Sequence, residues 1–200
     1  MSPELIDQCI EALYASVTAP AELPSALASV ATLFDATGAT YLRTGTGGVL
    51  LDAADYGRDA SVLDLFVRHY NIHDPTRPLL IASRPCEWFE DDRVLDPGSA
   101  SAGEYVHDFA WRAGIRWFRG GKIFEDARGA AFISVQRPAD AKPFGREATH
   151  LLDCLRPHLA RMARMREQLS KTIFATQALQ ATTDALSASV FIVDAECRVT

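Results

Sequence analysis

Two histidines and an aspartate stand close together in residues 69–75 and are the first candidates for chemistry. His69 and His73 are four residues apart, a spacing that puts two metal ligands on one face of a helix, and Asp74 follows directly. Pro75 indicates, however, that the helix ends before it. No third ligand stands nearby in the sequence, so we expect no metal here.

Asp74 precedes a proline, and such a carboxylate has two common uses. It can cap its own turn by accepting a backbone N–H two residues further on. A buried carboxylate, in contrast, needs a hydrogen-bond donor, which an amide ligand can supply. The sequence leaves both interpretations open.

Catalytic side chains in recognisable patterns are missing elsewhere. The acidic run Glu90–Asp92 is typical of a solvated loop, and neither Ser99 nor Ser101 has the glycine context of a hydrolase nucleophile. The four cysteines are far apart and form no CxxC pair, which argues against a zinc ribbon or a redox motif. We therefore expect a protein that is not an enzyme and that uses no cofactor or metal.

The composition of the 200 residues describes a globular chain. Hydrophobic residues make up 48%, enough for a substantial core, and the formal net charge is −6. The negative charge argues against nucleic-acid binding over the whole chain. No apolar run reaches membrane-spanning length, and the N-terminus does not resemble a signal peptide. These features predict a cytoplasmic protein with no membrane partner.

Residues 1–142 are predicted to form one domain. Apolar residues recur at three- and four-residue steps in two opening helices, and glycine-rich or polar turns join two pairs of strands as hairpins. Hairpins imply an antiparallel sheet, which helices must cover, so the fold class is α+β with layers. The expected elements are helices from Leu5 to Val17, Leu23 to Phe34, Ala60 to Tyr70 and Gly103 to Ala113, strands Ala39–Thr44, Val49–Ala53, Ile115–Phe124 and Ala130–Arg137, and a long irregular region Arg77–Ser101.

Residues 143–187 are helical in pattern almost throughout. From Ala148 to Ile173, apolar residues alternate at steps of four and three, interrupted by Arg166. A narrow stripe of this kind is typical of a seam between helices, so beyond Arg161 we expect a helix of a parallel homodimer, while the first part packs on the domain's own sheet. Pro157 should kink or split the helix.

Residues 188–200 are expected to be the first strands of a second, truncated domain. Val190–Val193 reads as a buried strand, and Arg198–Thr200 begins a partner for it. Because a two-stranded hairpin alone is marginal in water, more of that domain should follow.

Several segments resemble, in order, the ligand-binding domains of LuxR-type transcription regulators. The segments are Tyr70–Pro75, Glu87–Phe89, Glu104–Arg116, Ala131–Val135 and Pro143–Leu159, and Val190–Val199 is similar to the opening strands of a PAS domain. The resemblance implies a GAF/PAS-like domain with a central antiparallel sheet, a long helix and the start of a PAS-like unit. It also implies a small-molecule effector, a homodimer, and DNA contact only through a helix-turn-helix domain that this sequence lacks.

The resemblance also implies ligand-binding residues. In quorum-sensing members an aspartate before proline accepts the amide hydrogen of an acyl-homoserine lactone, which matches Asp74. A tryptophan in the following loop matches Trp88, a serine or threonine of the last strand matches Ser134, and Tyr70 is a further candidate. Two aromatics that pack on the lactone in those sensors correspond by spacing to Ser61 and Leu65, so a different ligand is expected.

The sequence therefore supports two alternative functions. The first is a sensor module that binds a small molecule between the sheet and the Arg77–Ser101 region and passes the signal through the 143–187 helix. The second is a ligand-free dimerisation or protein-interaction scaffold with a GAF-like fold. A cavity filled by the chain's own side chains would favour the second.

Overall fold

A computed structural model describes residues 3–85, 87–90, 95, 96, 98 and 103–185, and these residues form an α+β fold, as predicted. Five antiparallel strands form one sheet in the order β2–β1–β5–β4–β3. The elements run α1 (Pro3–Thr18), η1 (Pro20–Glu22), α2 (Leu23–Leu33), β1 (Gly38–Gly45), η2 (Thr46–Gly48), β2 (Leu50–Tyr56), α3 (Ala60–Arg68), η3 (Tyr70–Ile72), α4 (Arg77–Ala82), β3 (Trp88–Glu90), the π-helical segment η4 (Tyr105–Ala110), β4 (Trp117–Asp126), β5 (Gly129–Arg137) and α5 (Arg146–Ala185).

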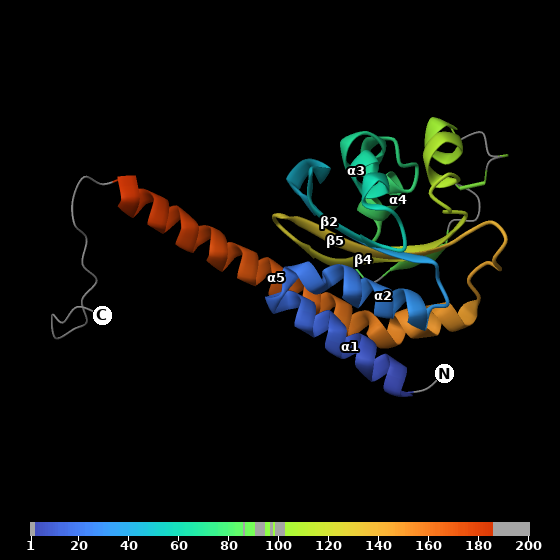
Figure 1. Cartoon of the computed structure of the whole chain (residues 1–200), viewed down its shortest axis with the longest axis horizontal. Coiled ribbons are helices and arrows are strands. Elements are labelled where there is room, and N and C mark those ends of the chain that lie inside the picture. Colours follow the sequence, from blue (N-terminus) through green and yellow to red (C-terminus); the bar gives the residue numbers. More distant parts are fainter. Residues whose placement is uncertain (1–2, 86, 91–94, 97, 99–102, 186–200) are drawn as a thin grey trace.

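The sheet lies between two helical layers (Figure 1). Helices α1, α2 and the first part of α5 cover one face, and α3, α4 and η4 stand over the other. Each layer has its own apolar core. Leu27 of α2 and Leu155 of α5 are fully buried in the first, and Phe66 of α3 and Phe109 of η4 are buried in the second. Side chains of alternate strand residues therefore enter different cores.

The region Arg77–Ser101, predicted to be irregular, is partly regular. It contains the helix α4 and the edge strand β3, which pairs with β4 through Trp88 opposite Gly121. Both elements are short, six and three residues, so neither shows a clear periodicity in the sequence. Tertiary pairing with β4 therefore decides the structure of this region. The expectation of one long loop was wrong for the described residues.

Helix α5 has 40 residues and runs without interruption through Pro157, so the predicted split does not occur. Proline removes the hydrogen bond to the carbonyl of Asp153. Both residues are exposed, so water can bind that carbonyl and the helix continues. The described helices include none that is long and apolar enough to cross a membrane.

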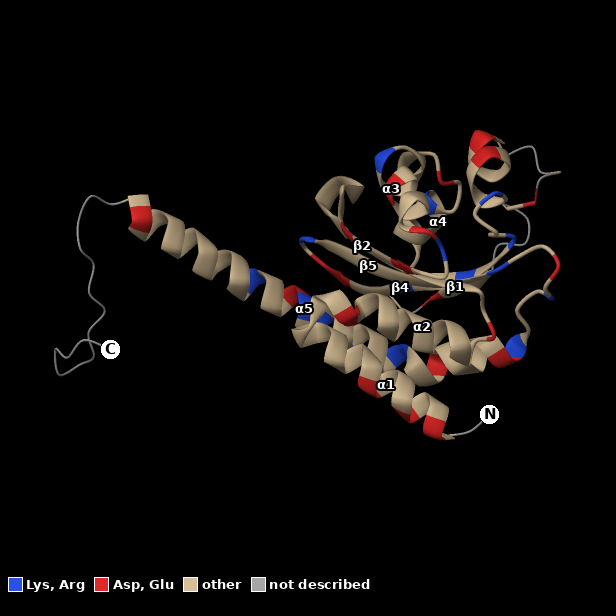
Figure 2. Cartoon of the chain, in the orientation of Figure 1, with Lys and Arg blue, Asp and Glu red and all other residues tan. Residues whose placement is uncertain are grey.

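The two ends of α5 have different surroundings. Up to Leu169 its apolar stripe packs on the sheet and on α1, whereas the part from Lys171 onward leaves the domain (Figure 1). This projecting part carries few charges (Figure 2) and exposes Ile173, Phe174 and Leu179. These side chains form an apolar surface that no other described part of the chain covers. Residues 186–200, where the second domain was expected to begin, lie outside the described residues.

Candidate functional site

A cavity of about 60 Å³ lies between the sheet and the layer of α3, α4 and η4. Its walls are mostly apolar and come from helices and strands alike, because both layers direct their buried side chains to this space. Four of the apolar lining residues are phenylalanines. The apolar side chains that enclose it include Val62, Phe66, Leu80, Phe109, Phe118 and Phe132.

One wall of the cavity is polar and is built on three neighbouring strands. Asp55 at the end of β2 forms an ion pair with Arg58, and its Oδ1 also accepts a hydrogen bond from Thr40 of β1 at 2.7 Å. Arg58 donates to Thr40 at 2.8 Å and to Gln136 of β5 at 3.2 Å. Gln136 in turn donates to the hydroxyl of Ser134 at 2.7 Å. These five residues form one connected network that lines the cavity.

Asp74 lines the same cavity and is a buried acceptor. Its Oδ1 accepts hydrogen bonds from the backbone N–H and the hydroxyl of Thr76, both at 2.8 Å, and Tyr105 is a further hydrogen-bond partner. Burial raises the pKa of Asp74 to about 6, and the hydrogen bonds and the charge of Arg77 oppose this rise only in part. The carboxyl therefore caps its own turn and also faces the cavity, and its contact with a ligand stays a prediction.

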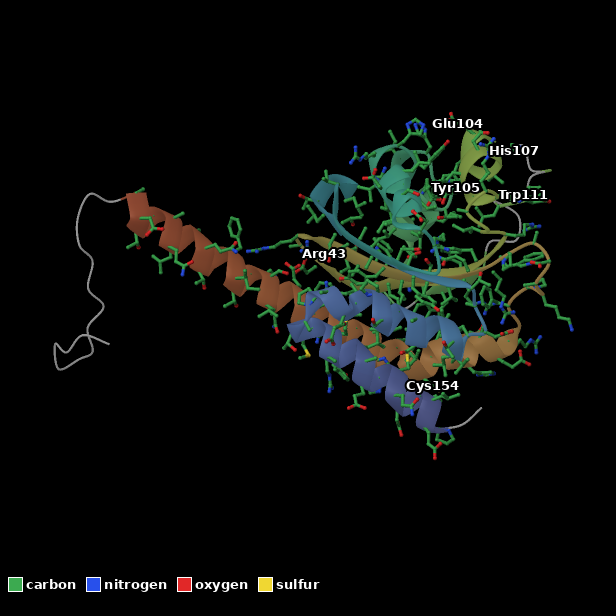
Figure 3. All side chains as sticks on the ribbon, in the orientation of Figure 1. Arg43, Glu104, Tyr105, His107, Trp111 and Cys154 are labelled. Atoms are coloured by element: carbon green, nitrogen blue, oxygen red, sulfur yellow. The ribbon has the colours of Figure 1, made fainter. Side chains whose placement is uncertain are left out.

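Tyr105 completes this group from η4 (Figure 3). Burial raises the pKa of its phenol well above the ordinary value, and the neighbouring charge of Asp74 adds to the effect. The phenol thus stays protonated and can donate to Asp74 at any physiological pH. The charge of Arg58 is close enough to act on the same phenol in the opposite direction.

The structure places two of the four predicted ligand-binding residues, Asp74 and Ser134, at the cavity wall. Tyr70 is buried one layer behind it, where its ring stacks on Phe109 with 4.8 Å between centroids. It therefore supports the wall. Whether any of these residues contacts a ligand stays a prediction.

Trp88 lies on the opposite side of the sheet. It stands opposite Gly121 in the β3–β4 pair and packs against the core beneath α1, α2 and α5. The next residue, Phe89, packs in the core on the cavity side instead. Since successive residues of a strand face opposite ways, a shift of one position decides which of them can approach a ligand. Trp88 does not line the cavity.

Two positions correspond by spacing to the aromatics that pack on the lactone in quorum sensors. Both also point away from the cavity. Ser61 and Leu65 are exposed on α3, whereas Val62 and Phe66 line the cavity. Val67 is exposed as well. The face that α3 buries is set by its packing on the sheet, and a nine-residue helix is too short for its periodicity to define that face.

Sequence reasoning missed the network of Asp55, Arg58, Thr40 and Gln136. Its only local signal is an aspartate and an arginine three residues apart after a strand. The other two members are separated from them by 15 residues or more and come together only through strand pairing. Tyr105 belongs to the resembling segment Glu104–Arg116, but nothing in that segment predicts that the tyrosine lines the cavity.

Helix α5 is bound to the sheet by ion pairs where it leaves the domain. Arg43 of β1 pairs with the buried Glu167, and Arg166 contacts Asp52 of β2 at 3.2 Å. Figure 3 shows Arg43 beside this part of α5. Lys171 reaches both Glu167, at 3.2 Å, and Asp126 of β4, at 3.4 Å. The same strand β1 that carries Thr40 at the cavity thus holds α5 on its other face.

No known family model matches the sequence, and no curated protein matches it either. Solved structures do resemble the fold. The N-acylhomoserine lactone-dependent LuxR family factor CepR2 of Burkholderia cenocepacia has a TM-score of 0.59 at 15% identity, covering 80% of this chain and 92% of that one. The LBD domain of VqsR from Pseudomonas aeruginosa has 0.57 at 15% identity, with coverages of 82% and 94%.

A GAF domain/HD domain protein of Geobacter sulfurreducens also resembles this chain, with a TM-score of 0.52 at 13% identity and coverages of 80% and 94%. All three identities are low, so the likeness shows the fold. The chain has the GAF-like α+β fold that is also found in LuxR-family regulators.

Proposed function

We propose that the chain is the sensor module of a LuxR-type transcription regulator and that a small molecule binds in the cavity beside Asp74. The observation that carries the proposal is the mostly apolar cavity lined by the carboxyl of Asp74, whose pKa burial raises to about 6. A ligand that donates a hydrogen bond to this carboxylate would offset the cost of burying its charge. The fold likeness to LuxR-family regulators supports the same function.

The signal would travel through strand β1. Its residues alternate between the cavity, with Thr40 and Leu42, and the α5 side, with Tyr41 and Arg43. A ligand that prefers one position of β1 therefore also favours one arrangement of the Arg43–Glu167 pair and of the projecting helix. In this proposal α5 transmits the change to a partner subunit and to a DNA-binding domain of the regulator. The chain itself performs no catalysis.

Binding in this cavity is tested by thermal shift with a library of metabolites and lactones. We expect at least one compound to raise the melting temperature of the unmodified chain, because a ligand that binds only the folded state stabilises it. Val62→Phe fills the cavity and should abolish that shift, whereas Leu65→Phe on the exposed face of the same helix should preserve it. If no compound stabilises the chain, the small cavity belongs to a ligand-free scaffold instead.

Dimerisation through α5 gives a separate prediction. Ile173 continues the stripe of Leu169 beyond the domain and is 46% exposed in the single chain, so we expect a dimer in which it is buried. Ile173→Asp should lower the mass measured by light scattering toward that of a monomer. Ala175→Asp, about 200° around the helix from Ile173, should leave the dimer intact. If the unmodified chain is a monomer at high concentration, the predicted dimer interface is wrong. That result would not affect the proposal of ligand binding.

A further inference from the structure

Asp55 has a buried oxygen that accepts no hydrogen bond within the part of the chain that the structure describes. Its side chain is only 8% exposed, and its Oδ1 takes part in all the contacts with Thr40 and Arg58. Its Oδ2 is buried and accepts no hydrogen bond from any described residue. An unsatisfied buried acceptor costs about 1–3 kcal/mol, so such an oxygen calls for a donor.

Two neutral donors beside Asp55, Thr40 and Gln136, already use their hydrogens on atoms other than Oδ2. The Thr40 hydroxyl donates to Oδ1, and the Gln136 amide N–H₂ donates to both the Thr40 and Ser134 hydroxyls. The hydrogens of Thr40 and Gln136 are thus used on other atoms, and Oδ2 accepts none of them. Since Asp55 lines the cavity, the missing donor can come from a molecule bound there.

The cavity restricts the size and shape of that molecule. About 60 Å³ is far less than the several hundred that a drug-sized ligand fills, so an extended acyl chain does not fit in this arrangement. The walls provided by Phe66, Phe109, Phe118 and Phe132 favour a flat ring, because aromatic rings gain from edge and offset contacts with one another.

The charges of the cavity restrict the ligand further. Arg58 is the one basic residue among the described lining residues, and Asp55 already balances it. Asp74 adds a second carboxyl to the same wall. An anionic ligand would bring another negative charge into a space whose described lining residues offer no cation besides the paired Arg58, and this is strongly unfavourable in a buried site.

We propose that the cavity binds a compact, neutral, single- or fused-ring molecule whose N–H or O–H group donates a hydrogen bond to Asp55 Oδ2. The proposal rests on the sensor function above and narrows its ligand to this chemical class. Asp55 thereby becomes a ligand-binding residue in addition to Asp74. The arrangement of Arg58, Thr40 and Gln136 holds its carboxylate in place and leaves one oxygen free.

Matched probe pairs test the donor directly. The probes are indole with 1-methylindole and phenol with anisole, titrated into the full chain by calorimetry or ligand-observed NMR. We expect the donor-bearing member of at least one pair to bind at least tenfold more tightly than its methylated partner, because only the donor satisfies the oxygen. Equal binding of both members, or no binding by either donor-bearing probe, would overturn the proposal.

A variant and a crystal structure identify the oxygen that accepts the hydrogen bond of the ligand. Asp55→Asn should reduce the preference for indole over 1-methylindole to less than threefold, while Asp64→Asn, an exposed carboxyl on α3, should preserve it. Since Asp55→Asn also disturbs the Arg58 pair, a crystal structure of the unmodified chain with indole provides a second measurement. It should place the indole nitrogen within hydrogen-bond distance of Oδ2. A water molecule that occupies this position with every probe would contradict the proposal.

The experiments distinguish a wrong ligand class from a wrong sensor function. If the ring probes do not bind but a lactone or another metabolite from the library stabilises the chain, the ligand class is wrong and the sensor function stands. If neither set binds, both fail together.

Discussion

Asp74→Asn is expected to increase the free energy of unfolding at pH 7, by up to about 3 kcal/mol. In the folded chain, burial raises the pKa of this carboxyl from 3.8 to about 6. The folded state therefore binds a proton that the unfolded state releases between these two values, and the charged form is unfavourable above them. Asparagine has nearly the same shape, still accepts hydrogen bonds from Thr76, and carries no charge.

The pH dependence distinguishes this cause from a simple packing effect. Below about pH 4 the aspartate is protonated in both states, so the variant and the unmodified chain should be about equally stable. As pH rises toward 6, the unmodified chain loses stability relative to the variant, and above 6 the difference is constant. Denaturant unfolding without ligand at pH 3.5, 6 and 8 measures this difference.

The control for this prediction is Asp64→Asn, which removes an exposed carboxyl paired with Arg68. It should change stability by less than about 1 kcal/mol at each pH. A difference for Asp74→Asn that does not change with pH would show that desolvation of the charge is not its source. Lower stability of that variant at pH 7 would show that the folded chain stabilises the charged carboxylate.

Arg58→Met is expected to destabilise the chain by about 3–5 kcal/mol. The side chains of Arg58 and Asp55 are only 9% and 8% exposed, and removal of the cation leaves a buried carboxylate without its partner. The hydrogen bonds of Arg58 to Thr40 and Gln136 are lost as well. Chemical denaturation at pH 7 gives the change in the free energy of unfolding.

A matched control for this variant lies on α3. Arg68→Met breaks the Arg68–Asp64 pair, whose side chains are 76% and 56% exposed, and should cost less than about 1 kcal/mol. The double variant Asp55→Leu/Arg58→Met removes both charges and should regain most of the lost stability, because apolar pairs often replace buried ion pairs without loss. Equal losses for Arg58→Met and Arg68→Met would mean that the pair at the cavity is solvated.

The layered fold could be predicted because its signals are local. The helical steps from Leu23 to Phe34 bury every residue that the pattern selected, and the polar turn before Gly129 joins two strands as expected. The long helix followed from its apolar stripe, although Pro157 did not split it. In these segments the local pattern of apolar and polar residues agrees with the packing in the folded chain. The sequence is therefore sufficient to predict their secondary structure.

The cavity was predicted only in part. Asp74 could be found because the Asp-Pro step marks a turn, and Ser134 because a resembling segment contains it. Trp88 was placed by the same resemblance, but its strand register turns it to the other core. A resemblance between motifs matches positions along the sequence. It does not determine which side of the sheet a residue of a short edge strand faces.

The amino-acid sequence by itself determined the α+β class, the order of helices and hairpins outside Arg77–Ser101, and the projecting α5, because periodicity and turns act over a few residues. Only the tertiary structure decided which side chains meet at the cavity. Thr40, Asp55 and Gln136 come from three strands, and the pairing register that aligns them depends on contacts across the whole sheet. The open oxygen of Asp55 is therefore a property of the folded chain, and no stretch of the sequence shows it.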